Sequence, residues 1–323
     1  MKIDVYNWEL SKITSVLSWV SLVFETKYKT YGKFQLELIF NEDNLKLAQQ
    51  AKYVTTNESD EVVILMSWRV SQDRIIINGF TADYILSKRV QSRWFGLGEV
   101  AADLMVGAVN GINSWHPLLV AENTQNIQDS YRPAFEGGSV LEFCEAIAEK
   151  TDIGFKVVKE DDHLKFVPYK PSLNKQVKFA PEYGNVFNQN YTWSLNEFSN
   201  VAYVIGGDLW EIVVVEKEDA VPPPIFNNRF EILIDATSIN REDGETLDDY
   251  KKRLEDYGQQ KLAELTTTET TTFEVNDQRA KLGDLVSVRL TIPVERVVSA
   301  RVVGVVIKSQ ENKTTRTLTL SAR

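Results

Sequence analysis

The C-terminal stretch RAKLGDLVSVRLTIPVERVVSARVVGVVIKSQENKTTRTLTLSAR, residues 279–323, decides the fold class of this chain. Leu285 to Ile292 and Thr314 to Ser321 alternate apolar with polar residues, and Val297 to Lys308 holds seven Val and Ile residues in twelve positions. β-Branched side chains suit a pleated sheet, and Gly283-Asp284 and Glu311-Asn312-Lys313 are typical turn residues. The pattern predicts an antiparallel meander whose middle strand is apolar on both faces, as inside a barrel or sandwich.

Composition places the chain among ordinary globular proteins and disfavours several classes. Its 323 residues predict two or three domains. Its formal net charge of −10 argues against a general nucleic-acid binder, because neutralising phosphates requires a basic surface. The single cysteine, Cys144, excludes an intramolecular disulfide and a cysteine zinc site. Met1 to Leu10 lacks the apolar core of a signal peptide, and no run of about 18 apolar residues predicts a membrane span.

Residues 1–95 are predicted to form an N-terminal β-barrel-like domain with one short helix. Lys33 to Phe40 shows the clearest alternation, with Phe34, Leu36, Leu38 and Phe40 on one face. Asn41 to Asn44 then caps a helix predicted over Leu45 to Ala51. The other predicted strands are Met1 to Trp8, Leu17 to Phe24, and the hairpin of Glu61 to Trp68 with Arg74 to Asn78.

Residues 96–185 are predicted to form a smaller α+β insertion module. One helical piece begins just before it, at Thr81, with Asp83, Lys88 and Arg89 expected to face water, and a second runs from Glu99 to Val109. Ser139-Val140-Leu141-Glu142 is a capping box that predicts the start of a third helix. Phe155 to Lys159 and Leu164 to Tyr169 are expected to pair as a hairpin. The polar stretch between Ile112 and Phe135 is interpreted as an irregular surface excursion.

Residues 186–323 are predicted to form a second β-barrel-like domain. The prediction permits a domain to be built from segments that are not consecutive in the sequence. The long helix of this second domain, residues 246–265, has an apolar stripe and an N-terminal cap from Thr246 with Asp249. Strands are expected at Asn190 to Leu195 and Asn200 to Ile205. Glu211 to Val215 and Phe230 to Asp235 are expected to pair with each other across a polar loop that contains Pro222 to Pro224. The fold class predicted for the whole chain is therefore α+β and rich in strands.

A search for chemistry finds no catalytic, cofactor-binding or metal-binding residues to propose. His116 and His163 are not spaced with other metal ligands, and Glu160-Asp161-Asp162 lacks the alternating spacing of a calcium loop. Gly96-Leu97-Gly98 is only the start of a dinucleotide fingerprint and is interpreted as a helix break. Cys144 lies on the predicted buried face of a helix, which indicates a core thiol rather than a nucleophile.

Taken in order, several stretches resemble the hub proteins at the tip of bacteriophage tails. They are Phe34 to Leu45, the hairpin Glu61 to Asn78, Gly79 to Arg89, Gly138 to Cys144, Asn200 to Gly207 and Lys281 to Val288. Each motif alone is unspecific, and their order along nearly the whole chain carries the resemblance. The resemblance implies a non-enzymatic protein with two barrel-like domains and smaller α+β insertions.

The same resemblance implies a place in the virion tail and a set of partners. Hubs of this kind are usually homotrimers whose barrels form a ring of six equivalent positions. The implied partners are the distal tail protein, the tail tube and the tape-measure protein, with DNA passing through the lumen without specific binding. Many relatives continue into a hydrolase or host-binding region, so the chain is expected to be the structural hub alone or part of a longer protein. An acidic lumen would keep DNA from sticking, because like charges repel.

Two other functions remain as alternatives. A cell-wall hydrolase, either a peptidase or a glycosidase, would need a cleft with a nucleophile or a carboxylate pair. A carbohydrate-binding module would need exposed aromatic rings, for which Trp94, Trp115 and Trp210 are candidates, although core packing is the more common role of a tryptophan.

Overall fold

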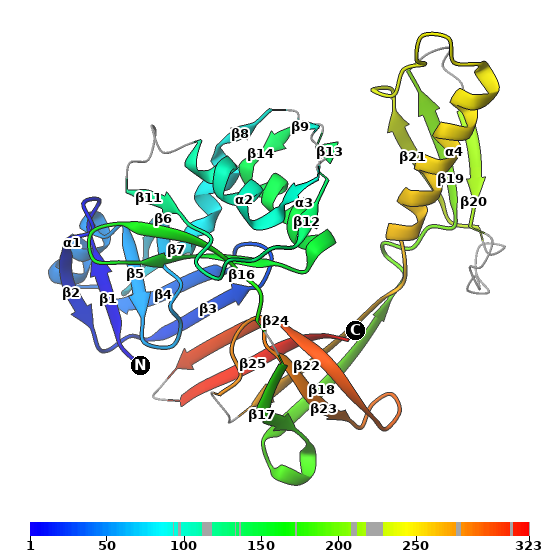
Figure 1. Ribbon diagram of the computed structural model, residues 1–323. Helices are drawn as coiled ribbons and strands as arrows, with labels where there is room; N and C mark the ends of the chain where they lie inside the picture. Colours follow the sequence, from blue (N-terminus) through cyan, green and yellow to red (C-terminus); the bar gives the residue numbers. More distant parts are fainter. Residues whose placement is uncertain are drawn as a thin grey trace. The chain divides into compact units, whose positions relative to one another are not determined.

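A computed structural model describes residues 1–92, 94–95, 98–111, 118–132, 134–135, 137–171, 173–207, 212–217, 229–275, 279–310 and 313–322 (Figure 1). The chain divides into two compact units. The strand-rich unit comprises Met1–Asn190 and Thr271–Arg323, and the inserted unit comprises Tyr191–Thr270. The three-domain division predicted from the sequence stays a prediction, although the closing strands do cluster with the N-terminal ones.

The strand-rich unit is built around one 13-stranded sheet. Its main path runs through β18 (Val186–Ser194), β22 (Thr268–Val275), β25 (Lys313–Ala322), β24 (Arg296–Gln310), β3 (Ser21–Lys27), β4 (Lys33–Ile39), β7 (Arg74–Thr81), β6 (Val63–Ser71), β5 (Tyr53–Thr56), β1 (Ile3–Tyr6) and β2 (Lys12–Val16). Two further strands branch from β24, namely β23 (Leu285–Leu290) and then β17 (Leu173–Phe179). The strand-rich α+β class is confirmed, whereas the described strands do not show two closed barrels.

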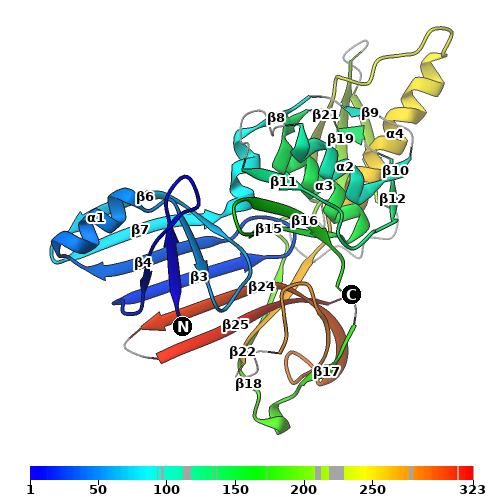
Figure 2. The same ribbon diagram turned by 60° about the vertical axis from the view of Figure 1, so that its left-hand side comes forward.

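Strand β24 explains why the two ends of the chain share a sheet (Figure 2). Its first residues pair with β23, as in Val286 opposite Ala300, and its last residues pair with β3, as in Ile307 opposite Phe24. β25 runs antiparallel along its other edge. The predicted antiparallel meander is thus confirmed, and its middle strand is long enough to join the N-terminal strands to the closing ones.

One continuous apolar core lies against this sheet and draws from both ends of the chain. Phe34, Leu36 and Leu38 of β4 are buried as the alternation predicted, and Leu318 and Leu320 of β25 are in the same core. Phe40 was assigned to that buried face but is 44% exposed, because β4 ends at Ile39. Helix α1 (Glu42–Gln50) begins one turn earlier than predicted, where the Asn41 side chain accepts a hydrogen bond from the Asn44 backbone N–H at 2.8 Å.

A helical layer with its own core completes the strand-rich unit. It contains the 3-10 helix η1 (Ala82–Lys88), α2 (Ala101–Asn110) and α3 (Val140–Thr151), packed with a small sheet in which β16 (Leu164–Tyr169) lies between β11 (Leu119–Ala121) and β15 (Gly154–Lys159). The capping box is confirmed, since Ser139 and Glu142 exchange hydrogen bonds of 3.1 and 2.6 Å between side chain and backbone N–H.

The structure describes three pairs of very short strands that were not predicted, and two of these six strands fall within residues 112–135, the stretch that was interpreted as irregular. β8 (Val90–Gln91) pairs with β14 (Gly138–Ser139), β9 (Trp94–Phe95) with β13 (Ala134–Phe135), and β10 (Glu99–Val100) with β12 (Ser130–Tyr131). Two-residue strands carry too few alternating positions to be recognised in a sequence, so the prediction missed these pairs. The remaining short element is the 3-10 helix η2 (Pro181–Tyr183).

The inserted unit is a three-stranded sheet with one long helix. β19 (Val201–Gly206) is central, β20 (Ile212–Glu216) pairs with it antiparallel, and β21 (Glu231–Ala236) pairs with it parallel. The predicted pairing of the β20 and β21 segments with each other is therefore wrong. β19 is the most buried of the three strands and offers both of its edges, so each neighbour pairs with it instead. Helix α4 (Leu247–Glu264) begins after Thr246, whose hydroxyl accepts a 3.2 Å hydrogen bond from the Asp249 N–H.

Candidate functional site

Among the residues that the structure describes, those singled out in the sequence for possible chemistry do not come together. Cys144 is fully buried in the core of α3, and this burial raises the pKa of its thiol, so the interpretation as a core thiol is confirmed. His163 is half-buried, and its ring nitrogens lie 3.3 Å from the Glu160 carboxylate and 2.9 Å from the Asp162 carboxylate. Gly96, Leu97 and His116 lie outside the described residues.

Two lysines partly compensate the charge of the acidic turn Glu160-Asp161-Asp162. Lys165 reaches Glu160 at 3.1 Å and Glu122 at 2.5 Å, and Lys159 donates to the backbone oxygens of Glu160 and Asp161. Among the residues that the structure describes, no group of three or more His, Cys, Asp or Glu could hold a metal ion. The turn is thus explained as a solvated and internally compensated loop.

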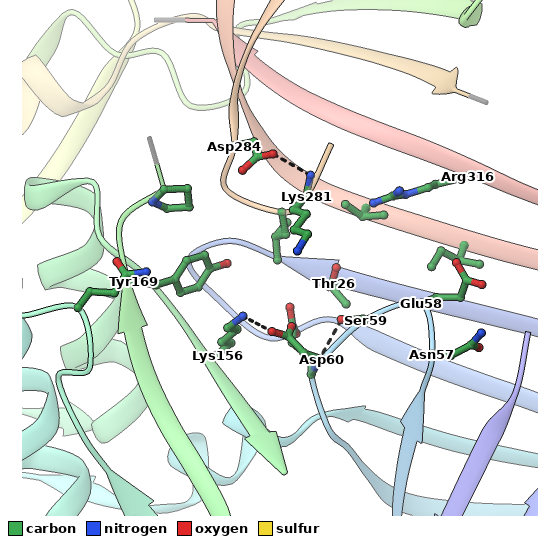
Figure 3. Close-up of a pocket in the computed structure, with 16 residues that line it drawn as sticks. Thr26, Asn57, Glu58, Ser59, Asp60, Lys156, Tyr169, Lys281, Asp284 and Arg316 are labelled. Atoms are coloured by element: carbon green, nitrogen blue, oxygen red, sulfur yellow. Dashed lines mark hydrogen bonds and ion pairs between the residues drawn. The ribbon is translucent and has the colours of Figure 1, made fainter. Parts of the chain in front are cut away.

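A polar cleft of about 500 Å³ opens in the strand-rich unit (Figure 3). One wall comes from Asn57 to Glu61, with Lys156 of β15 and Tyr169 of β16, and the other from the closing stretch, with Lys281, Asp284 and Arg316. Thr26 of β3 lies between these two walls. Sequence reasoning missed this cleft, because its walls are far apart along the chain and meet only through the pairing of β24 with β3.

Several charged groups of the cleft already have partners. Lys156 forms an ion pair with Asp60, and the Asp284 carboxylate accepts hydrogen bonds from the Asn174 side chain at 2.8 Å and the Lys281 backbone N–H at 3.0 Å. Burial raises the pKa of Glu61 and of Tyr169 well above their usual values. The described lining includes no histidine or cysteine. The described lining can therefore donate and accept hydrogen bonds.

Beside the cleft, Arg301 of β24 forms a buried junction between distant segments. Its guanidinium donates to the carbonyl oxygens of Gly283 at 2.6 Å and Pro171 at 3.2 Å, and it forms an ion pair with Asp152, which caps the C-terminus of α3. It also lies 5.3 Å from the ring centroid of Tyr28. A positive charge within the apolar run of residues 297–307 was the sequence signal for this junction, and it was missed.

The turn at Gly283 depends on the same junction. Gly283 has φ of +83°, and a Cβ atom there would lie 2.6 Å from the Tyr28 ring. Only glycine adopts this conformation at so close an approach without strain. The turn chemistry predicted for Gly283-Asp284 therefore serves to bring the closing stretch against Tyr28.

A second buried polar group lies in η1, where the sequence led to a wrong prediction. Asp83 was expected to face water, but it is 2% exposed. Burial raises its pKa to about 6, and burial also raises the pKa of the nearby carboxyls Glu61 and Glu145. The stretch from Ala82 to Lys88 folds as a 3-10 helix instead of an α-helix, so the face assigned by a 3.6-residue period was incorrect.

Of the three candidate rings for sugar binding, the structure describes Trp94. The ring centroids of Trp94 and Phe143 lie 5.8 Å apart, and Trp94 packs against the core of the helical layer. This confirms the core-packing interpretation for Trp94. Trp115 and Trp210 lie outside the described residues.

A comparison with known protein families settles the relationship of the chain. The family model described as Siphovirus ReqiPepy6 Gp37-like protein matches residues 2–321. This chain belongs to the Gp37-like family. A search of curated proteins found no match. The resemblance to phage tail hub proteins inferred from the sequence motifs is confirmed by this match together with the structural comparisons that follow.

The fold is similar to those of solved prophage and bacterial tail proteins. The 43 kDa tail protein of prophage MuSo2 from Shewanella oneidensis superposes with a TM-score of 0.56 at 11% identity, over 99% of this chain and 96% of that one. The tail protein from Neisseria meningitidis MC58 superposes with a TM-score of 0.57 at 13% identity, over 99% of this chain and 95% of that one. The prophage tail protein gp18 from Listeria monocytogenes superposes with a TM-score of 0.51 at 10% identity, over 99% of this chain and 94% of that one. At these identities the likeness shows a shared fold across the whole chain.

Hydropathy adds one observation on the helices. None of the described helices is both long enough and apolar enough to cross a lipid bilayer.

Proposed function

We propose that this Gp37-like protein is a structural hub of a phage or prophage tail tip, located in the virion tail. The family match over residues 2–321 carries the proposal. The similarity of the fold to tail proteins over 99% of the chain supports it. The hub would join the tail tube and the distal tail protein to the tip, and its work would be done by shape and assembly rather than by bond cleavage.

The homotrimer expected from the resemblance belongs to this proposal. A ring of subunits needs strand edges and faces that can meet a neighbour. Strand β6 offers such an edge, because β5 pairs only with its first residues, Val63 and Ile64, and the later residues up to Ser71 pair only with β7 among the described strands. Met66, Trp68 and Val70 on this edge are 48, 42 and 44% exposed. We infer that the neighbouring subunit covers them.

The division of charge between the two units bears on the proposed passage of DNA through the lumen of the hub. Residues 191–270 carry 17 acidic and 7 basic residues, a net charge of −10, and the remaining residues carry 29 of each. If the strand-rich unit lines the lumen, its overall charge is zero and non-sticking passage depends on which side chains face inward. A dense Lys and Arg lining in the assembled ring would contradict passive conduction.

Sedimentation tests the trimer directly. The wild-type chain is expected to form trimers alone or with the distal tail protein, and Trp68→Glu is expected to shift the equilibrium to monomers because it buries a charge at the contact. Val120→Glu, at a 40% exposed strand position away from β6, is the matched control and should assemble normally. A strict monomer even with the distal tail protein would overturn the trimer, and an unaffected Trp68→Glu assembly would exclude this edge.

A zymogram on bacterial cell walls separates the hub from the hydrolase alternative. The proposal expects no clearing by the purified chain. Wall clearing that is abolished by changing a cleft residue such as Glu61 would favour the enzyme.

A further inference from the structure

The three-stranded sheet of the inserted unit has one apolar face that its helix does not cover. Helix α4 packs on one face, where Tyr250, Leu254 and Leu262 bury the side chains of Val204, Val213 and Val215 (Figure 1). The opposite face presents Ile212, Val214 and Leu233, which are 54, 48 and 65% exposed.

These side chains form one continuous patch. Tyr203 pairs with Val214 on one side and Leu233 on the other, so the three residues form a row across the sheet. Ile205 and Ile212 form the next row. Residues paired across strands lie on the same face about 5 Å apart, so no polar side chain interrupts these rows until Asp235 at their edge. An apolar patch with a polar border is typical of a protein contact surface.

Negative charge borders this patch. At one end Arg229 forms ion pairs with Glu216, at 2.9 Å, and with Glu231, and it donates to the Tyr203 hydroxyl at 3.2 Å. One guanidinium thus faces two carboxylates, which leaves that end net negative. At the other end Asp235 accepts hydrogen bonds from Thr237, and this lowers the pKa of its carboxyl. The whole unit, residues 191–270, holds the entire net charge of the chain, −10.

This charge decides among the possible occupants. A second copy laid face to face would bring two units of −10 together, and like charges oppose such a contact. Nucleic acids and anionic lipid surfaces are opposed for the same reason. A basic protein surface gains both from burying the apolar rows and from pairing with the acidic border.

We propose that the uncovered face of β20, β19 and β21 docks a different protein, through an apolar segment that is flanked at both ends by lysine or arginine. Its apolar side chains would pack over Val214, Tyr203 and Leu233, and its basic side chains would meet Glu216, Glu231 and Asp235. This inference goes beyond the hub function and does not depend on it.

Binding of a model peptide to the full-length chain tests the proposal. The probes are three short fluorescent peptides, measured by anisotropy: valines flanked by lysines (the valine–lysine peptide), valines flanked by glutamates, and glycines flanked by lysines. The valine–lysine peptide is expected to bind at least tenfold more tightly than either of the others, because only it supplies both an apolar row and positive charge. Its affinity is expected to fall as salt is raised, since exposed charge pairs are screened.

Two variants connect this binding to the face. Leu233→Asp is expected to weaken valine–lysine binding at least tenfold, whereas Val294→Asp, at a similarly exposed position of the strand-rich unit, should leave it unchanged. Circular dichroism checks that both variants are folded. Equal binding of the three peptides, or equal loss in both variants, would overturn the proposal. A change in oligomeric state caused by Leu233→Asp would instead make the face a contact between copies and would also overturn it.

Discussion

Asp83 shows how one buried carboxyl controls stability with pH. Burial raises its pKa from 3.8 to about 6. Between these two values the folded state therefore keeps a proton that the unfolded state has already lost. The stability that this proton provides is fully present below about pH 4 and is lost as the pH rises through 6. The buried charge at pH 7 then costs up to about 3 kcal/mol.

Asp83→Asn should remove this cost. We expect the free energy of unfolding to rise by about 1–3 kcal/mol at pH 7 and to change little at pH 4, because the amide carries no charge at either pH. Urea denaturation between pH 4 and pH 8 measures both effects. Asp161→Asn, in an exposed turn, is the control. An Asp83→Asn protein with the same pH dependence as the wild type would contradict the assignment.

Arg301 is the residue on which the junction between distant segments depends. Arg301→Ala is expected to destabilise the protein by about 3–5 kcal/mol, because Asp152 and two carbonyl groups lose a buried partner. Arg301→Lys should be intermediate, since an ammonium cannot reproduce the planar fork of a guanidinium. Arg69→Ala, at an exposed strand position, should change stability by less than about 0.5 kcal/mol. Chemical denaturation measures the free energy of unfolding of each variant. If Arg301→Ala and Arg69→Ala lowered it equally, the junction at Arg301 would not contribute to stability.

At the scale of elements, the surroundings of two helical glycines predict opposite changes in stability when each is replaced by alanine. In α2, a Cβ atom at the exposed Gly107 would meet no atom within 4 Å, so Gly107→Ala should stabilise the protein by about 1 kcal/mol through helix propensity. In α4, a Cβ atom at Gly258 would lie 2.7 Å from Val204 and 2.8 Å from Val215. Gly258→Ala should therefore destabilise the inserted unit by about 1–3 kcal/mol, because the helix must move off its sheet.

Thermal unfolding of the two glycine variants measures this contrast, with the wild type as reference. Stabilisation by Gly258→Ala would mean that the helix lies farther from β19 and β20 than the structure shows.

At the scale of the whole molecule, the two compact units have separate cores. The core of the inserted unit shares no residue with the two cores of the strand-rich unit. We therefore expect two transitions in differential scanning calorimetry. Gly258→Ala should lower only one of them, and Arg301→Ala should lower only the other. If each variant shifted both transitions together, the units would unfold as one cooperative body.

The candidate sites show where sequence reasoning is sufficient and where it fails. The burial of Cys144 followed from its place on an apolar helix face, and the capping box at Ser139 followed from four consecutive residues. The polar cleft and the Arg301 junction could not be predicted in this way. Arg301 and Asp152 are 149 positions apart, and the only local signal was a charge inside an apolar strand.

Local patterns in the sequence predicted most of the longer strands, the major helices and their caps, because alternation and capping depend on residues only a few positions apart. The fold was needed to show that β24 joins both ends of the chain, that β19 separates β20 from β21, and that Asp83 is buried. The fold also supplied the bounds of the inserted unit, and with them the finding that the net charge lies in residues 191–270. Strand partners and burial depend on which distant segments meet, and many pairings satisfy the same local pattern.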